Sequence, residues 1–422
     1  MDILRSDELD AEGLSADQVR EWMNKECREW HLEGKKLLLI VPDQTRTAPL
    51  GVVFKAFCNL WLDRVQMLDV MIALGTHPPM SEGGICKRLE LSTEERYGRY
   101  GKVRFFNHEW DKTAQLCEIG TLKSREIEEA SGGLFAMDVK VQINRRIFDY
   151  DRIIIMGPVY PHEVVGFSGG NKYLFPGISG AEIINFFHWL GAVVTSPKII
   201  GKAHTPVRAV VNLAAGLIDM PKSCFCLVTD HKGNLAALTA GTPEEAWEQA
   251  WPVVEKLHVT YKSEPFKLII SCAPEMYDEL WVAGKCMYKL EPVLAQGGEL
   301  IIYAPHLEKV SEVHGEKIAQ VGYHCRDFFL KQWDRYKMFP WGVLAHCTHV
   351  FGGGTYDPNT GTETPRARVI LASKISPEHC KKINLGYCNP DSINPEDYRN
   401  REEEGILMVP RAGEMLFRLK EE

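Results

Sequence analysis

The 422-residue sequence contains no apolar run of about 18 or more residues, so it predicts no membrane-spanning helix. Its opening residues are acidic and lack the apolar core of a secretory signal peptide. No CxxC pair occurs, and the 12 cysteines are scattered along the chain, which indicates reduced and mostly buried thiols. These absences together predict a cytoplasmic protein.

An excess of basic charge is also absent. The 49 Lys and Arg residues are outnumbered by 57 Asp and Glu residues, giving a net charge of −8. This balance argues against nucleic acid or an anionic membrane as the partner. The negative net charge does not argue against a small anionic substrate, because a few positively charged side chains near a site set its local electrostatic field. Oligomeric state cannot be predicted from these features.

The length and the order of elements predict two α/β domains with parallel-type sheets and an active site in the cleft between them. A polar stretch before residue 266 suggests boundaries at residues 1–262, 263–400 and 401–422, with the last segment returning to the first domain. Strands are expected at residues 37–41, 66–74, 102–107, 139–143, 152–156, 266–271, 299–304 and 368–371. Helices are expected at residues 50–62 and 280–294.

Three of the expected strands each end in a polar loop. The strand at residues 37–41 leads into Asp43 and Arg46, and the strand at residues 66–74 leads into His77. The strand at residues 152–156 leads into His162 and then into a glycine-rich segment. Ligands of open α/β folds bind outside the carboxyl ends of strands, so these loops predict one active-site crevice.

The glycine-rich segment, Gly166-Phe167-Ser168-Gly169-Gly170-Asn171-Lys172-Tyr173, resembles a phosphate-binding loop only in part. A nucleoside-triphosphate loop needs Gly directly before Lys and Ser or Thr directly after it. This chain has Asn171 and Tyr173 there, which argues against a triphosphate site. Gly169 and Gly170 could still cradle a single anion, although a tight turn with a solvated lysine is the simpler interpretation.

Histidines are the remaining candidates for chemistry. His77 and His162 follow separate strands, where neutral imidazoles near pH 7 suit general acid/base work. His188 has aromatic neighbours in the sequence, and the pair His346 and His349 is a weaker metal-binding candidate. Three imidazoles can hold zinc, so a metal-dependent hydrolase using His77, His162 and His188 is the alternative function.

The combined pattern resembles the nickel-dependent lactate racemase family. The resemblance rests on the order and spacing of Asp43-Gln44-Thr45-Arg46, Gly75-Thr76-His77, Pro161-His162, Lys172 and His188, and extends through Thr205-Pro206-Val207-Arg208 and residues 274–285. It implies a racemase or epimerase that inverts C2 of a 2-hydroxy acid by moving hydride to and from a nickel-pincer nucleotide. Separate maturation enzymes would have to make this cofactor. A protein that binds the nucleotide without turnover is a further possibility.

The resemblance also implies a role for each site residue. Lys172 matches the lysine that tethers the cofactor, and His188 matches the nickel ligand. His77 and His162 match the two acid/bases. The residues expected to complete the site are Arg46 and Lys285, which would hold the substrate carboxylate, and Asp43, which would support the cofactor or Arg46.

One departure from the family bears on the substrate. Lactate racemases carry a Tyr-Gln pair shortly before the lysine that matches Lys285, whereas this chain has Trp281 and Val282. Residues 328–341 are rich in aromatic side chains, which could receive a larger substrate such as an aldonic acid. Core packing is the simpler interpretation of those rings. We therefore expect a substrate larger than lactate or different from it, with Trp281 in contact with it.

Overall fold

The computed structural model describes residues 3–6, 13–45 and 47–420. The chain forms two compact units. The first unit comprises Met1–Pro161, Phe167–Phe187 and Pro206–His258, and the second comprises His162–Gly166, His188–Thr205 and Val259–Glu422. Two short segments from the middle of the sequence therefore belong to the second unit, whereas the sequence suggested crossings only near residues 262 and 400.

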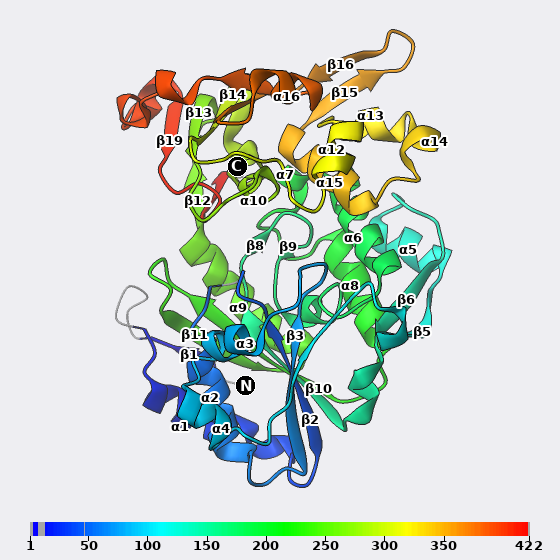
Figure 1. The fold of residues 1–422 in the computed structure, drawn as a ribbon, viewed down its shortest axis with the longest axis vertical. Helices are drawn as coiled ribbons and strands as arrows, with labels where there is room; N and C mark the ends of the chain where they lie inside the picture. Colours follow the sequence, from blue (N-terminus) through cyan, green and yellow to red (C-terminus); the bar gives the residue numbers. More distant parts are fainter. Residues whose placement is uncertain (1–2, 7–12, 46, 421–422) are drawn as a thin grey trace. The chain divides into compact units, whose positions relative to one another are not determined.

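The first unit is built on a seven-stranded sheet with the order β1-β11-β10-β7-β2-β3-β4 (Figure 1). Its strands are β1 (Leu4–Arg5), β2 (Lys36–Pro42), β3 (Met67–Ala73), β4 (Phe105–Asn107), β7 (Arg152–Pro158), β10 (Lys222–Thr229) and β11 (Leu235–Gly241). The five strands from β10 to β4 are parallel, so the carboxyl ends of β2, β3 and β7 lie at one edge. The central runs of Val, Ile and Leu are buried on both faces, as parallel strands require.

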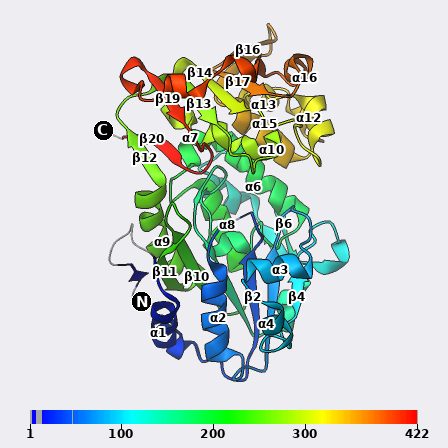
Figure 2. The same ribbon diagram turned by 60° about the vertical axis from the view of Figure 1, so that its left-hand side comes forward.

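Helices cover both faces of this sheet. On one face lie α1 (Ala16–Glu26) and α2 (Leu50–Trp61) (Figure 2). Their buried side chains share a core with Phe225. On the other face lie α8 (Pro206–Gly216) and α9 (Pro243–His258), which enclose the glycine-rich turn η4 (Gly170–Tyr173). The fold is therefore a three-layer α/β arrangement with the turn held at the carboxyl edge.

The remaining elements of the first unit lie around this core. They are η1 (Cys27–Trp30), α3 (Glu82–Arg88), α4 (Thr93–Tyr97), η2 (Thr113–Gln115), α5 (Ser124–Ser131), η3 (Arg145–Asp149) and the antiparallel pair β5 (Leu116–Leu122) and β6 (Val139–Asn144). The helix α6 (Ala181–Val194) begins in this unit and ends in the second one. The short strands β8 (Pro161–His162) and β9 (Gly166–Phe167) are likewise shared.

The second unit has a five-stranded parallel sheet with the order β18-β17-β14-β13-β19. Its strands are β13 (Phe266–Cys272), β14 (Leu294–Ala304), β17 (Arg368–Ser373), β18 (Gly386–Cys388) and β19 (Ile406–Val409). Two smaller pairs accompany it: β15 (Gly354–Asp357) with β16 (Thr362–Pro365), and β12 (Val259–Lys262) with β20 (Leu416–Leu419). The helices are α7 (Ser196–Ile199), α12 (Gly315–Val321), α13 (Arg326–Leu330), α14 (Trp333–Tyr336), α15 (Trp341–Phe351) and α16 (Pro377–Lys382), with 3-10 turns η6 (Pro390–Ser392), η7 (Pro395–Tyr398) and η8 (Glu402–Glu404).

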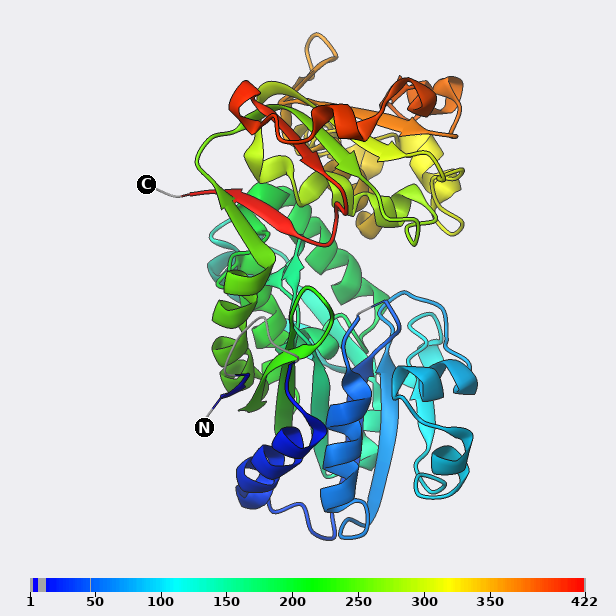
Figure 3. The same ribbon diagram turned by 90° about the vertical axis from the view of Figure 1, so that its left-hand side faces the viewer.

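These sheets confirm the prediction of an α/β fold with two parallel-type sheets. The chain's last strand, β20, pairs with β12 (Figure 3). Both strands belong to the second unit, although β12 falls within residues 1–262, which the sequence assigned to the first domain. Within the described residues, no helix combines the length and the apolarity needed to cross a bilayer.

The single helix predicted over residues 280–294 is wrong in its extent. The structure has two four-residue helices, α10 (Leu280–Ala283) and α11 (Lys285–Tyr288), followed by η5 (Glu291–Val293). Gly284 separates the first two and lies against α15, where a Cβ would sit 2.7 Å from Val350. Pro292 lacks the N–H that a continuing helix needs.

Candidate active site

Asp43 and His77, 34 positions apart, are brought into direct contact at the carboxyl edge of the first unit's sheet. His77 Nδ1 lies 2.5 Å from Asp43 Oδ2. Because an ionised carboxylate only accepts, this bond assigns the proton to Nδ1 and leaves Nε2 as an acceptor. The other carboxylate oxygen accepts from Thr45 N at 3.1 Å and Thr45 Oγ1 at 2.6 Å. Asp43 is 5% exposed while the His77 side chain is 48% exposed, so the buried carboxylate orients an accessible base.

His162 has the opposite arrangement. Its Nδ1 accepts the backbone N–H of Val164 at 3.1 Å, which assigns the proton of the neutral ring to Nε2. The carboxylate of Glu163 lies 3.4 Å from the same Nδ1. The ring is buried in the second unit, so its tautomer is set by local backbone geometry rather than by solvent. His77 therefore presents an acceptor at Nε2, and His162 presents a donor there.

Lys172 lies on a turn that the first unit holds from two helices. Arg208 of α8 donates to the carbonyls of Phe167 and Gly169, and its guanidinium stacks 4.3 Å from the Trp247 ring centre. Trp247 Nε1 donates to Ser168 O at 2.9 Å. Arg208 is 3% exposed, and burial lowers its pKa to about 10. A buried guanidinium thus fixes the backbone just before Lys172.

Two backbone N–H groups and one side-chain amide of this turn are used within the protein. Ser168 N donates to Tyr160 O, and Lys172 N donates to Gly169 O. Asn171 Nδ2 donates to Glu244 and Asn212. This pattern favours a tight structural turn over an anion cradle at Gly169 and Gly170, and it leaves the Lys172 side chain as the chemically distinctive group.

His188 lies near the middle of α6, in the part of that helix that belongs to the second unit. The next residue, Trp189, is fully buried and stacks on Trp333 with ring centres 5.2 Å apart and planes 10° apart. Trp189 also meets Phe329 edge-on. The aromatic residues of residues 328–341 contact one another in the same way, which supports the packing interpretation of that stretch.

Lys285 begins α11 and is half-buried. Its Nζ lies 5.2 Å from the ring centre of Tyr277, a cation–π contact that positions the ammonium group. Gly413 approaches both side chains closely, because a Cβ there would lie 2.9 Å from Lys285 Cβ and 2.8 Å from the Tyr277 ring. The absence of a side chain at Gly413 therefore makes room for Lys285.

Trp281 is held between two imidazoles. Its ring lies 4.1 Å from that of His346 and 4.2 Å from that of His314. His346 is buried, its Nε2 lies 3.3 Å from Tyr323 Oη, and burial lowers its pKa to about 3. This His346 is a neutral packing partner of Trp281. No group of three or more His, Cys, Asp or Glu side chains arranged to hold a metal occurs among the described residues.

Arg46 falls outside the described residues. Sequence reasoning missed the partners of the candidate residues: Asp43 as the partner of His77, Glu163 beside His162, and Arg208 beneath the lysine turn. Only Arg208 had a signal, since an arginine on an otherwise apolar helix face must find buried acceptors.

Comparison with known proteins bears on the family. Residues 1–199 match the model of the lactate racemase N-terminal domain. This match places residues 1–199 in the lactate racemase family. It is 27% identical over 289 residues to the lactate racemase of Thermoanaerobacterium thermosaccharolyticum, an alignment that spans 64% of this chain and 60% of that protein.

Solved structures resemble the chain along nearly its whole length. A crystal structure of a protein from Thermotoga maritima is 32% identical with a TM-score of 0.85, and the match covers 99% of this chain and 100% of that one. The lactate racemase apoprotein from Thermoanaerobacterium thermosaccharolyticum has a TM-score of 0.73 at 17% identity, covering 97% of this chain and 94% of that one. The latter likeness shows the shared fold. None of these comparisons supports a metal-dependent hydrolase.

Proposed function

We propose that this protein is a racemase or epimerase that inverts C2 of a 2-hydroxy acid. The observation that carries the proposal is the complementary state of two histidines. His77 is held with Nε2 as a proton acceptor, and His162 is held with Nε2 as a proton donor. Inversion needs one group that takes the substrate's hydroxyl proton and another that returns it from the opposite side, and the roles exchange for the other stereoisomer.

Asp43 orients His77 and supports the charge that the ring would carry. As His77 takes up a proton, its ring becomes cationic, and the buried carboxylate 2.5 Å away stabilises that charge. His162 acts as the acid once a proton on Nδ1, beside the Glu163 carboxylate 3.4 Å away, replaces the bond from Val164 N–H; loss of the Nε2 proton then leaves a neutral ring. Each histidine can therefore hold a proton for the lifetime of a planar keto acid and then return it. Lys285, placed by Tyr277, would hold the substrate carboxylate together with Arg46.

The residues present suit a nickel-pincer nucleotide. Lys172 offers a primary amine on a turn whose backbone is fixed by Arg208, as a covalent tether requires. His188 offers an imidazole, a donor type that nickel accepts. When bound, this group would supply a reversible hydride acceptor for C2. The protein's own part is to hold the substrate and to move the hydroxyl proton.

We propose a substrate larger than lactate, such as an aldonic acid. Support comes from Trp281 and Val282, which replace the Tyr-Gln pair of the related lactate racemases. His314 and His346 cover the Trp281 ring, so a substrate would meet its edge rather than an open face. Hydroxyl groups of a sugar acid suit the polar edges of such a cluster.

The test uses the full chain produced together with the cofactor-synthesis enzymes. Single stereoisomers of hydroxy and sugar acids, deuterated at C2, are incubated with it and analysed by NMR. We expect inversion with deuterium retained at C2, because hydride moves without entering solvent. Inversion with loss of deuterium to water would refute hydride transfer, and no inversion of any acid would refute the racemase assignment.

The tether has its own test. Intact-protein mass spectrometry should show a nucleotide-sized increment on the wild type that is absent from Lys172→Ala. Lys202→Ala, which removes another lysine outside this turn, is the matched control and should keep the increment. An increment that persists on Lys172→Ala would contradict the tether.

A further inference from the structure

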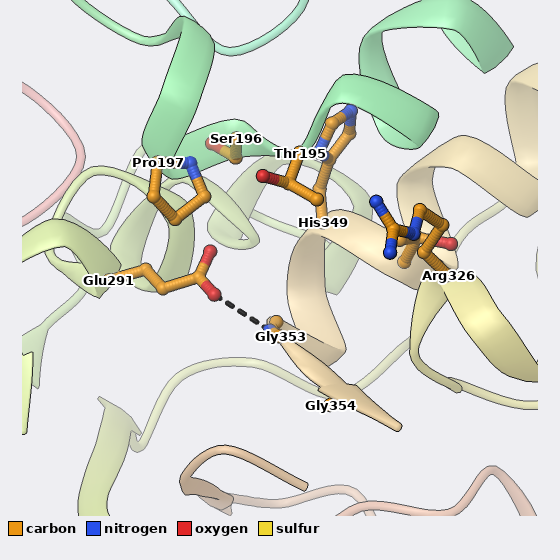
Figure 4. A pocket seen from close by; sticks show the side chains of 10 residues that line it. Thr195, Ser196, Pro197, Glu291, Arg326, His349, Gly353 and Gly354 are labelled. Carbon is orange, nitrogen blue, oxygen red and sulfur yellow. Dashed lines mark hydrogen bonds between the residues drawn. The ribbon is translucent and has the colours of Figure 1, made fainter. Parts of the chain in front are cut away.

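The second unit contains a cavity of about 50 Å³, lined by both polar and apolar groups, that no candidate active-site residue lines (Figure 4). Its walls come from four segments: the link from α6 to α7, η5, α13 and the turn from α15 to β15. A water molecule needs roughly 10–15 Å³ measured in the same way. The cavity therefore has room for a small organic molecule.

Several buried polar groups at this cavity lack partners. The Ser196 hydroxyl, in a residue 2% exposed, has no hydrogen bond, and neither ring nitrogen of His349, 4% exposed, has one. Such groups are rare in folded proteins because leaving them unpaired destabilises the fold. Two adjacent examples indicate that the cavity is shaped for a bound molecule.

The cavity also presents opposite charges. The carboxylate of Glu291 and the guanidinium of Arg326 point toward one another across it in Figure 4. Glu291 is 2% exposed, and one of its oxygens accepts Gly353 N–H at 2.7 Å. Arg326 is held by bonds to Val193 O at 3.0 Å and to Asp327 at 3.0 Å. Each group keeps capacity for a further partner.

The rim of the cavity is conformationally unusual. Thr195 has a φ of +87°, a conformation that a β-branched residue rarely adopts. Residues held in such conformations cluster at ligand-binding sites. Thr195 directly follows α6, the helix that carries His188, so a molecule bound here would contact the end of that helix.

The chemistry of the walls selects the ligand class. Arg326 disfavours a metal cation, and Glu291 disfavours a multiply charged anion such as phosphate. A molecule with a carboxylate for Arg326 and a hydroxyl for Glu291 and Ser196 satisfies both ends. We propose that this cavity is a second binding site for a short hydroxycarboxylate, separate from Lys285, at which the molecule binds without turnover. The choice of ligand class rests on the proposed function.

The test is isothermal titration calorimetry of the full chain with glycolate, which has no stereocentre to invert. Propionate lacks the hydroxyl, and ethylene glycol lacks the carboxylate, so both serve as matched probes. Lys285→Ala removes the expected active-site anchor and should still bind glycolate. Arg326→Gln should weaken that remaining binding at least tenfold, and both matched probes should bind at least tenfold more weakly than glycolate.

A second variant protects the test against a folding defect. Ser196→Ala leaves the charges in place and should weaken glycolate binding severalfold while the unfolding temperature stays near that of the wild type. Binding lost in Lys285→Ala, binding unchanged in both cavity variants, or no binding at all would overturn the proposal. Calorimetry needs no turnover, so a cavity that binds glycolate in a protein without racemase activity would refute the proposed function alone.

Discussion

Replacing Asp43 by asparagine should remove the ability of His77 to act as a base while leaving the fold intact. Thr45 donates two hydrogen bonds to Asp43 Oδ1, at 3.1 Å from N and 2.6 Å from Oγ1. The asparagine oxygen must take that position, so its NH2 group faces His77 Nδ1. His77 can then accept only at Nδ1, which moves its proton to Nε2 and removes the base.

The expected loss follows from that change of tautomer. A misplaced general base costs roughly 10²- to 10⁴-fold in rate, equivalent to about 3–5.5 kcal/mol of transition-state stabilisation. Because the equilibrium constant belongs to the substrate, kcat/KM must fall by the same factor in both directions. Polarimetry or NMR of the cofactor-loaded variant with each stereoisomer measures both values.

Two controls interpret the result. Thr45→Val keeps the Asp43 carboxylate and should lose less than tenfold in kcat/KM. The mass increment at Lys172 and the nickel content of Asp43→Asn should equal those of the wild type, since neither depends on the His77 tautomer. Activity of Asp43→Asn within tenfold of the wild type would refute the assignment of His77 as an oriented base.

Three further predictions concern the second unit. Burial raises the pKa of Glu291 from 4.5 to about 7. The folded state therefore binds this proton more tightly than the unfolded state does. The difference corresponds to about 3 kcal/mol of folding stability, which is lost as the pH rises from 4.5 through 7. Glu291→Gln should remove this pH dependence in urea titrations, and an unchanged slope would contradict it. Thr195→Gly should raise the unfolding free energy by about 1 kcal/mol, because relief of a strained φ of +87° outweighs the added chain entropy; Thr195→Ala, which keeps the strain, should not. Gly413→Ala should raise KM more than it lowers kcat by displacing Lys285 and Tyr277, and an unaltered KM would show that this close approach is unimportant.

The strands that sequence predicts well are those with continuous branched apolar residues. The runs at residues 37–41 and 152–156 became β2 and β7, since a parallel strand covered on both faces leaves no polar position. By contrast, β11 reads Leu-Ala-Ala-Leu-Thr-Ala-Gly, whose small residues carry no strand signal, and it was not predicted. Its conformation is set by pairing with β10 and β1, which local sequence does not encode.

The candidate site divides in a similar way. Residue types at strand ends identified His77, His162 and Lys172 as candidates, and the resemblance to the lactate racemase family added the role of His188. The hydrogen bonds that decide what each histidine can do could not be predicted. The partner of His77 lies 34 positions away, and the state of His162 depends on the backbone N–H of Val164.

The stacked indoles of Trp189 and Trp333 give this protein an optical reporter. Two nearly parallel rings with centres 5.2 Å apart lie close enough for their excited states to couple. Trp189 directly follows His188, and open-shell metal ions quench nearby tryptophan emission by energy and electron transfer. The fluorescence of this pair should therefore report metal loading continuously, in solution and without any attached label.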